Sequence, residues 1–193
     1  NIIGKYRKVH LPGHSEYDHD RAFQHLEKRY FLPGDMGFPV WRNLNAMMGM
    51  CICNDRRWPE VYREMGLQGV ELLMLGYNTP SVNSQMSDEG LEKRLYHSEL
   101  CMTAGAYQNS TWVIGVAKAG SEDGHPLIGG SIIVDPDGNV VAKASSEDDE
   151  LIVHACDMEA CNFGKSTIFD FARHRRIEHY TRISTQTGVV RPD

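Results

Sequence analysis

Positive charge is in short supply in this chain, and so are long hydrophobic runs. The 193 residues carry 20 Lys and Arg against 26 Asp and Glu, a net charge of −6 with His neutral. This balance disfavours nucleic acid or an anionic membrane as the main partner. No apolar stretch approaches the roughly 20 residues that a membrane-spanning helix requires. We therefore expect no nucleic-acid and no membrane partner, and one domain over residues 1–193 with a substantial core.

Cysteine is scarce, and its spacing fits neither a disulfide framework nor a zinc site. There are five Cys residues, an odd number in a chain large enough to fold without disulfides, which indicates a reducing cytoplasm. The pairs Cys51-x-Cys53 and Cys156-x4-Cys161 lack the paired CxxC spacing of zinc ligands. We therefore predict a cytoplasmic protein with no metal and no cofactor.

One cysteine nevertheless stands in a reactive setting. An apolar run ending at Cys53 predicts a buried strand. It stops at a polar stretch of one Asn, one Asp and two Arg, after which Pro59 occupies the first turn of a predicted helix, where its missing N–H is tolerated. A helix N-terminus and guanidinium groups favour a thiolate, and a similar strand-to-helix turn presents the serine of α/β-hydrolases. A lone cysteine is more often a small core residue, but this neighbourhood favours a nucleophile.

The remaining pattern predicts an α/β layered domain. Residues 2–9 are expected to be extended and to form a first strand. Further strands are predicted at residues 38–41, 47–53, 70–75, 111–118, 131–134, 139–144 and 151–156, and helices at 60–67 and 91–107. Asp135-Pro136-Asp137-Gly138 marks the turn of a hairpin.

Three segments carry a family resemblance: Gly4–Gly13 (GKYRKVHLPG), Phe23–Phe31 (FQHLEKRYF) and Ile52–Glu60 (ICNDRRWPE). On composition alone the first two would be solvated faces. Together with Gly76–Pro80 and Tyr107–Asn109 they resemble the nitrilase superfamily of carbon–nitrogen hydrolases, over essentially the whole chain. Within it, the chain is most similar to amidohydrolases of N-carbamoyl-D-amino acids. The resemblance implies the four-layer α-β-β-α sandwich of that superfamily.

The resemblance also implies catalytic roles, because the family works with a Glu-Lys-Cys triad. The nucleophile falls on Cys53 and the lysine on Lys8, while Glu27 matches a second glutamate that orients the lysine and the substrate. Physical chemistry supports these roles: a lysine ammonium and the backbone N–H of Asn54 would stabilise the oxyanion formed at a ureido carbonyl. A carboxylate beside Lys8 would keep that lysine charged.

Substrate contacts are implied for seven further residues. Guanidinium groups bind carboxylates bidentately, so Arg56 and Arg57 are expected to bind the carboxylate of an N-carbamoyl amino acid. The alternative is that either arginine pairs with Asp55 or Asp35 and merely holds the loop. The other family positions that line the pocket fall on Asn54, Asn78, Thr79, His10 and His25, the two histidines in supporting roles. His97 is a weaker match.

One part of the triad is absent from the sequence. The family's general base is a glutamate that precedes the lysine segment by roughly a hundred residues, whereas Lys8 lies near the first residue given. We therefore expect this chain to be the C-terminal portion of a longer hydrolase, with the triad glutamate upstream, and to be inactive alone. Family members assemble as homodimers or homotetramers, and residues 163–193 look suited to such contacts.

Two alternatives remain open. The protein could act on another ureido or amide substrate, as β-ureidopropionases do. It could also be an inactive binding or assembly subunit, which the missing glutamate would favour if the natural chain is this short.

Overall fold

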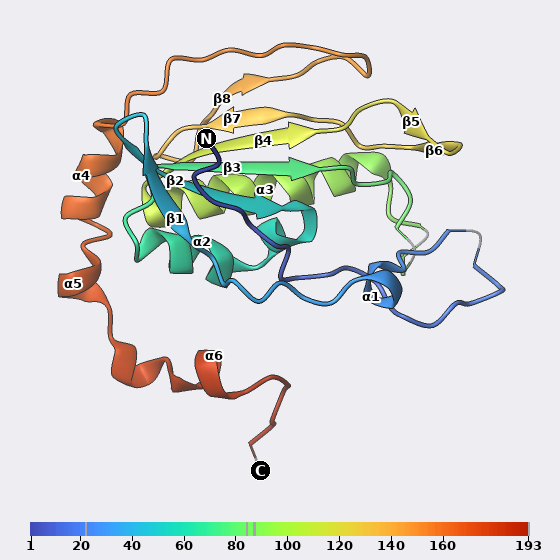
Figure 1. Cartoon of the computed structure of the whole chain (residues 1–193), viewed down its shortest axis with the longest axis horizontal. Helices are drawn as coiled ribbons and strands as arrows, with labels where there is room; N and C mark the ends of the chain where they lie inside the picture. Colours follow the sequence, from blue (N-terminus) through green and yellow to red (C-terminus); the bar gives the residue numbers. More distant parts are fainter. Residues whose placement is uncertain (22, 84, 87, 193) are drawn as a thin grey trace.

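The computed structural model describes residues 1–21, 23–83, 85–86 and 88–192. Its centre is a six-stranded mixed sheet in the order β1-β2-β3-β4-β7-β8 (Figure 1). The strands are β1 (Val40–Asn43), β2 (Ala46–Ile52), β3 (Leu72–Tyr77), β4 (Trp112–Ala117), β7 (Ile132–Val134) and β8 (Val140–Lys143). Strands β2, β3 and β4 are parallel, whereas β1, β7 and β8 are antiparallel to their neighbours. The carboxyl ends of β2 and β3 therefore lie side by side at one end of the sheet.

Two helices, α2 (Pro59–Gly66) and α3 (Leu91–Asn109), cover one face of this sheet (Figure 1). Alternate strand residues point toward them and are fully buried, among them Leu73, Val113 and Val134. At Gly105 in α3, an added Cβ would collide with the ring of Tyr62 in α2. The close contact of the two helices therefore depends on a glycine at this position.

The opposite face of the sheet is also apolar but only partly covered. Trp112 and Ile133 are buried there with Cys161 of helix α4 (Ala160–Ser166) and with residues 152–158. Towards the carboxyl ends of the strands, Ile52 is 39% exposed and Val116 is 58% exposed. The mixed α/β class predicted from the sequence is confirmed, and this sheet with its helical cover supplies one α layer and one β layer of the expected sandwich.

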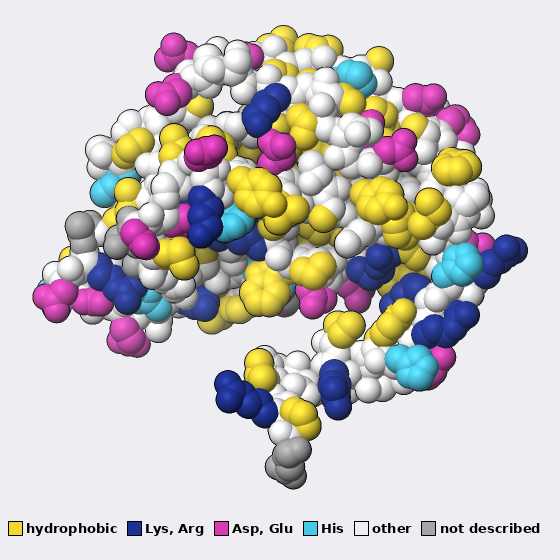
Figure 2. All heavy atoms as spheres, turned by 180° about the vertical axis from the view of Figure 1, so that it is seen from behind, with side chains coloured by type: hydrophobic (Ala, Val, Ile, Leu, Met, Phe, Trp, Pro, Cys, Tyr) yellow, Lys and Arg dark blue, Asp and Glu magenta, His cyan; other side chains and the backbone are white. Residues whose placement is uncertain are grey.

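Smaller elements border this body. They are α1 (Glu27–Tyr30), the 3-10 helix η1 (Cys53–Arg57) and the pair β5 (Ser121–Glu122) and β6 (His125–Pro126). Beyond α4 the chain forms an arm with α5 (Phe171–His174), η2 (Ile177–His179) and α6 (Thr181–Thr185), which extends away from the sheet (Figure 1). Lys, Arg and His side chains gather along this arm (Figure 2). No helix in the described residues is long and apolar enough to cross a membrane.

Two predicted strands are wrong. Residues 2–9 form no sheet ladder, because this segment is held mainly through side chains, with one backbone bond from Gly34 N–H to the Lys8 carbonyl. Residues 151–156 are likewise not a strand. Ile152 and Cys156 pack on the sheet while Leu151 and Val153 are exposed, so the segment has the alternation of a strand without a hydrogen-bonded neighbour among the described residues. The other predicted elements are present with shifted ends.

Candidate active site

The cysteine turn has the geometry of a strained nucleophile elbow. Strand β2 ends at Ile52, and Cys53 opens η1 with a φ of 50°, in the left-handed region that non-glycine residues rarely adopt. The side chain of Asp55 accepts a hydrogen bond from Ile52 N–H at 3.1 Å, which closes the turn. Pro59 then stands at the start of α2. Such strain persists where surrounding contacts enforce it, and it is common at functional sites.

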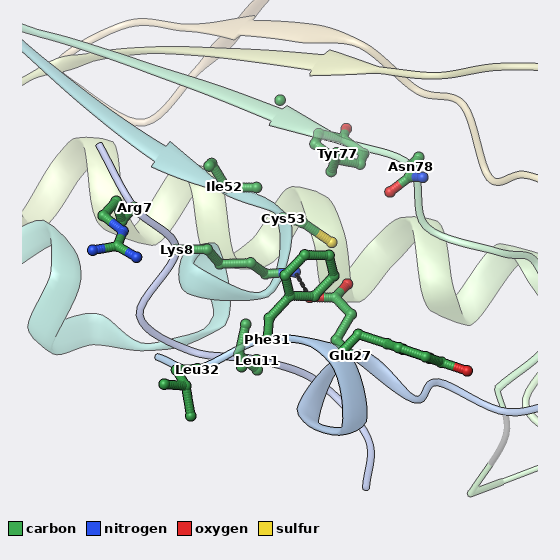
Figure 3. A pocket seen from close by; sticks show the side chains of 12 residues that line it. Arg7, Lys8, Leu11, Glu27, Phe31, Leu32, Ile52, Cys53, Tyr77 and Asn78 are labelled. Carbon is green, nitrogen blue, oxygen red and sulfur yellow. Dashed lines mark hydrogen bonds and ion pairs between the residues drawn. The ribbon is translucent and has the colours of Figure 1, made fainter. Parts of the chain in front are cut away.

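Lys8 and Glu27 lie beside Cys53 and bind each other. Lys8 Nζ donates to Glu27 Oε2 at 2.6 Å, with the lysine side chain 12% exposed. All three residues line a cavity of about 820 Å³, together with Phe31, Tyr77 and Asn78. Figure 3 shows Cys53, Lys8 and Glu27 directed into this cavity from the start of η1, the N-terminal segment and α1. The structure thus brings together the three side chains predicted to be catalytic.

A second cavity, of about 420 Å³, is also lined by Cys53. Its wall contains four of the predicted substrate contacts: His25, Asn54, Arg57 and Thr79. Arg57 Nη1 donates to Asn54 Oδ1 at 3.2 Å, so the amide orients the guanidinium. Burial and the nearby charge of Arg56 lower the pKa of Arg57, although an arginine stays charged at neutral pH. Burial also lowers the pKa of His25.

Arg56 occupies a different place from Arg57. It is 1% exposed, donates to the Cys53 carbonyl at 2.7 Å and to Thr79 Oγ1 at 3.0 Å, and stacks on the Tyr77 ring. Arg56 Nη1 also lies 4.0 Å from the Cys53 sulfur, so the buried guanidinium contacts both the turn and its side chain. Substrate binding by Arg56 stays a prediction, while Arg57 lies at the wall of the second cavity.

His10 and Asn78, two further predicted substrate contacts, occupy different places in the structure. His10 stacks between Phe38 and Trp58 and binds Asp55, so it supports the turn rather than lining either cavity. Asn78 follows β3 and lines the Lys8 cavity, and it also borders a smaller cavity of about 230 Å³ beside β5 and β6. Three cavities therefore meet at Cys53.

Two features were missed by the sequence reasoning. The first is Asp55, which the sequence reasoning considered only as a partner of Arg56 or Arg57. In the structure Asp55 accepts hydrogen bonds from Tyr6 and His10 instead. The other aspartate considered, Asp35, pairs with Arg7. The position of Asp55 three residues after the strand end was the available signal, since a carboxylate there can cap the turn. The second is a buried ion pair in the wall of the second cavity, where Glu89 binds Arg94 at 3.0 Å and His97 at 3.0 Å. Only His97 had a sequence signal.

Within the described residues, no group of three or more His, Cys, Asp and Glu side chains is placed to hold a metal ion.

Residues 1–165 match the family described as "Carbon-nitrogen hydrolase". The chain belongs to this family. It is 32% identical to N-carbamoylputrescine amidase of Arabidopsis thaliana, over 96% of this chain and 60% of that protein. It is 29% identical to citrullinase of Francisella tularensis, over 95% of this chain and 61% of that protein. The chain thus spans about three fifths of the length of these carbon–nitrogen hydrolases.

Solved structures agree with the fold. A carbon–nitrogen hydrolase from Helicobacter pylori G27 matches with a TM-score of 0.80 and 26% identity, covering 96% of this chain and 62% of that chain. This similarity confirms that the sheet and its helices are those of the nitrilase superfamily.

Proposed function

We propose that the protein, in its full natural length, hydrolyses N-carbamoyl-D-amino acids through a covalent intermediate on Cys53. The observation that carries this proposal is the Lys8–Glu27 pair beside Cys53, with Arg57 in the adjoining cavity. The ureido group would lie at Cys53, and the substrate carboxylate would lie against Arg57. The D configuration rests on the sequence resemblance alone.

The proposed reaction has two halves. The Cys53 thiolate attacks the ureido carbonyl carbon, and the Lys8 ammonium and the Asn54 N–H stabilise the oxyanion. Ammonia leaves and an N-substituted carbamoyl thioester remains on the sulfur. Water then cleaves the C–S bond, and the released N-carboxy amino acid loses carbon dioxide to give the amino acid. The triad glutamate that the family resemblance places before Asn1 would accept the thiol proton and donate it to the ureido nitrogen as ammonia leaves.

A cationic substrate is the main alternative, since four relatives, each 32% identical to this chain, are N-carbamoylputrescine amidases. The contacts of Glu89 argue against a cationic substrate. Among the described residues, Glu89 is the carboxylate that lines the second cavity. Hydrogen bonds from Asn83 and Arg94 lower the pKa of Glu89 and occupy its Oε2, while His97 contacts Oε1. A substrate ammonium would therefore compete with three internal partners, whereas a substrate carboxylate finds Arg57.

A substrate panel tests the proposal. The full-length protein would be assayed for ammonia release from N-carbamoyl-D- and L-amino acids, 3-ureidopropionate and N-carbamoylputrescine. We expect the highest kcat/KM with an N-carbamoyl-D-amino acid and no turnover by the Cys53→Ala variant. A higher kcat/KM for N-carbamoylputrescine or 3-ureidopropionate would replace the proposed substrate, and the absence of any turnover would favour a binding or assembly subunit.

Two accompanying proposals concern the setting of the enzyme. All five cysteines are unpaired, which is compatible with a cytoplasmic location. The arm exposes Ile177 at 68% and Ile183 at 65%, apolar surface that a second copy could cover, in keeping with a homodimer or homotetramer. Light scattering on the full-length protein would measure the oligomer directly.

A further inference from the structure

Asp55 is the most completely buried charged group near Cys53. Its exposed fraction is 0%, and both carboxylate oxygens are occupied. Oδ1 accepts the His10 backbone N–H at 2.8 Å and contacts His10 Nδ1 at 2.9 Å, while Oδ2 accepts the Tyr6 hydroxyl at 2.8 Å and the Ile52 N–H at 3.1 Å. Because the acceptor is a carboxylate, His10 Nδ1 is assigned as the protonated nitrogen.

These donors come from two segments that are far apart in the sequence but adjacent at the site. Tyr6 and His10 stand two residues before and two residues after Lys8. Ile52 immediately precedes Cys53. A single carboxylate therefore joins the segment that carries the lysine to the turn that carries the nucleophile.

The arginines next to Asp55 do not take part in this junction. Arg56 donates to the Cys53 carbonyl, Ser98 and Thr79, and Arg57 donates to Asn54. The Asp55 carboxylate instead accepts its hydrogen bonds from donors of the Lys8 segment and the turn. Burial and the hydrogen bond to Asp55 raise the pKa of Tyr6, so its hydroxyl remains a donor.

We infer that Asp55 is a positioning residue that fixes the Lys8 ammonium relative to the Cys53 sulfur. The inference rests on the proposed roles of Cys53 and Lys8 and deepens them. A displacement of about 1 Å can reduce a rate by a factor of about 100, so a rigid link between the two segments has a direct effect on the chemical step. Substrate binding through Arg57 does not pass through this link.

The test compares five variants of the full-length protein, with activity expressed per Cys53 that iodoacetamide labels, as measured by peptide mass spectrometry. Asp55→Asn keeps the size and shape of the side chain but replaces one carboxylate oxygen by an NH₂ group. This group would face the N–H and O–H donors that now bind Asp55. Tyr6→Phe removes a single hydrogen bond and keeps the ring beside Phe38. Asp35→Asn is the matched control, because it breaks the exposed pair with Arg7, the residue directly before Lys8. Lys8→Ala alone and combined with Asp55→Asn completes a double-mutant cycle.

We expect Asp55→Asn to lower kcat about 100-fold with KM within threefold of the parent value, and Tyr6→Phe to lower kcat several-fold. Asp35→Asn should stay within twofold. In the Lys8→Ala background, Asp55→Asn should change kcat less than threefold, because Asp55 then has no lysine to position.

Two results would overturn the inference. The first is an unchanged kcat per labelled site in both Asp55→Asn and Tyr6→Phe, which would limit Asp55 to fold stability. The second is a full 100-fold loss in the Lys8→Ala background, which would place the effect elsewhere. Activity of Cys53→Ala would overturn the proposed function itself, whereas a dead Cys53→Ala with an active Asp55→Asn would reject only the role of Asp55.

Discussion

At the scale of single residues, Arg56 and Arg57 show how adjacent identical side chains can differ in burial and in contacts. The 3-10 turn directs Arg56 into the interior against Tyr77 and leaves Arg57 at the second cavity. Neither the composition nor the family resemblance distinguishes the two residues, since either arginine can bind a carboxylate. Burial distinguishes them, and it depends on how the turn packs against α3.

Replacing each arginine should therefore have a different consequence. Arg57→Gln removes a charge-assisted hydrogen bond of about 1.5–3 kcal/mol, so KM for an N-carbamoyl amino acid should rise about 10- to 100-fold with kcat little changed. Arg56→Gln leaves Thr79 and the Cys53 carbonyl without their donor and should lower the melting temperature as well as kcat. Steady-state kinetics measures kcat and KM, and thermal unfolding measures the melting temperature. An equal rise of KM in Arg57→Gln and Arg56→Gln would contradict the different roles expected for the two arginines.

His25 gives a pH prediction at the same scale. Burial holds its pKa below the usual value, although the Glu27 charge opposes this. The unfolded chain therefore binds a proton more readily than the folded chain, so stability is lost as the pH falls below about 6.5. His25→Gln should reduce the loss of melting temperature between pH 7 and pH 5, while His179→Gln in the exposed arm should not. Parallel curves for the parent and His25→Gln would contradict this.

At the scale of elements, the contact of α2 with α3 fixes the turn in place. Gly105→Ala should raise helix propensity by up to about 1 kcal/mol, but the added methyl collides with the Tyr62 ring. We expect the collision to dominate and to destabilise the protein by about 1–3 kcal/mol. Gly90→Ala, at the N-terminal cap of the same helix with no heavy atom within 4 Å of the added Cβ, is the control. Chemical denaturation decides between them.

Elements also mark what the sequence could reveal. The strands β2, β3 and β4 were predictable because each is an unbroken apolar run. Such a run forms where at least one face of the sheet is covered by other elements. In residues 151–156, apolar and polar side chains alternate as in a strand. Such alternation requires only that one face of the segment is covered. A hydrogen-bonded ladder also needs a neighbouring strand, which the sequence pattern does not specify. The Lys8–Glu27 pair was anticipated through resemblance, whereas the junction at Asp55 depends on three segments meeting in space, which no local pattern encodes.

At the scale of the whole molecule, the sheet is covered unequally on its two faces. The rows Met50–Met74–Ile114 and Ile52–Gly76–Val116 lie on the face away from α2 and α3, and the second row is largely exposed. Apolar patches of this kind promote association. The chain matches about three fifths of its relatives' length.

Expressed alone, the 193-residue chain should therefore bind a fluorescent apolar dye, self-associate in light scattering and show no ureidolytic activity. The full-length protein should bind less dye per mole under the same conditions. A monodisperse, fully active 193-residue chain would refute this prediction.

The position of Cys53 at the end of β2 has a consequence for how the family can diversify. The proposed nucleophile, its turn and the residues after β3 rest on parallel strands whose lengths and register are fixed by the core. The outer walls of the cavities include Asn83, Gln85 and Glu89 and the β5–β6 hairpin, which lie outside the six-stranded sheet. Insertions and deletions in those walls can alter which substrates enter while leaving the reactive sulfur undisturbed, so new specificities can evolve without rebuilding the chemistry.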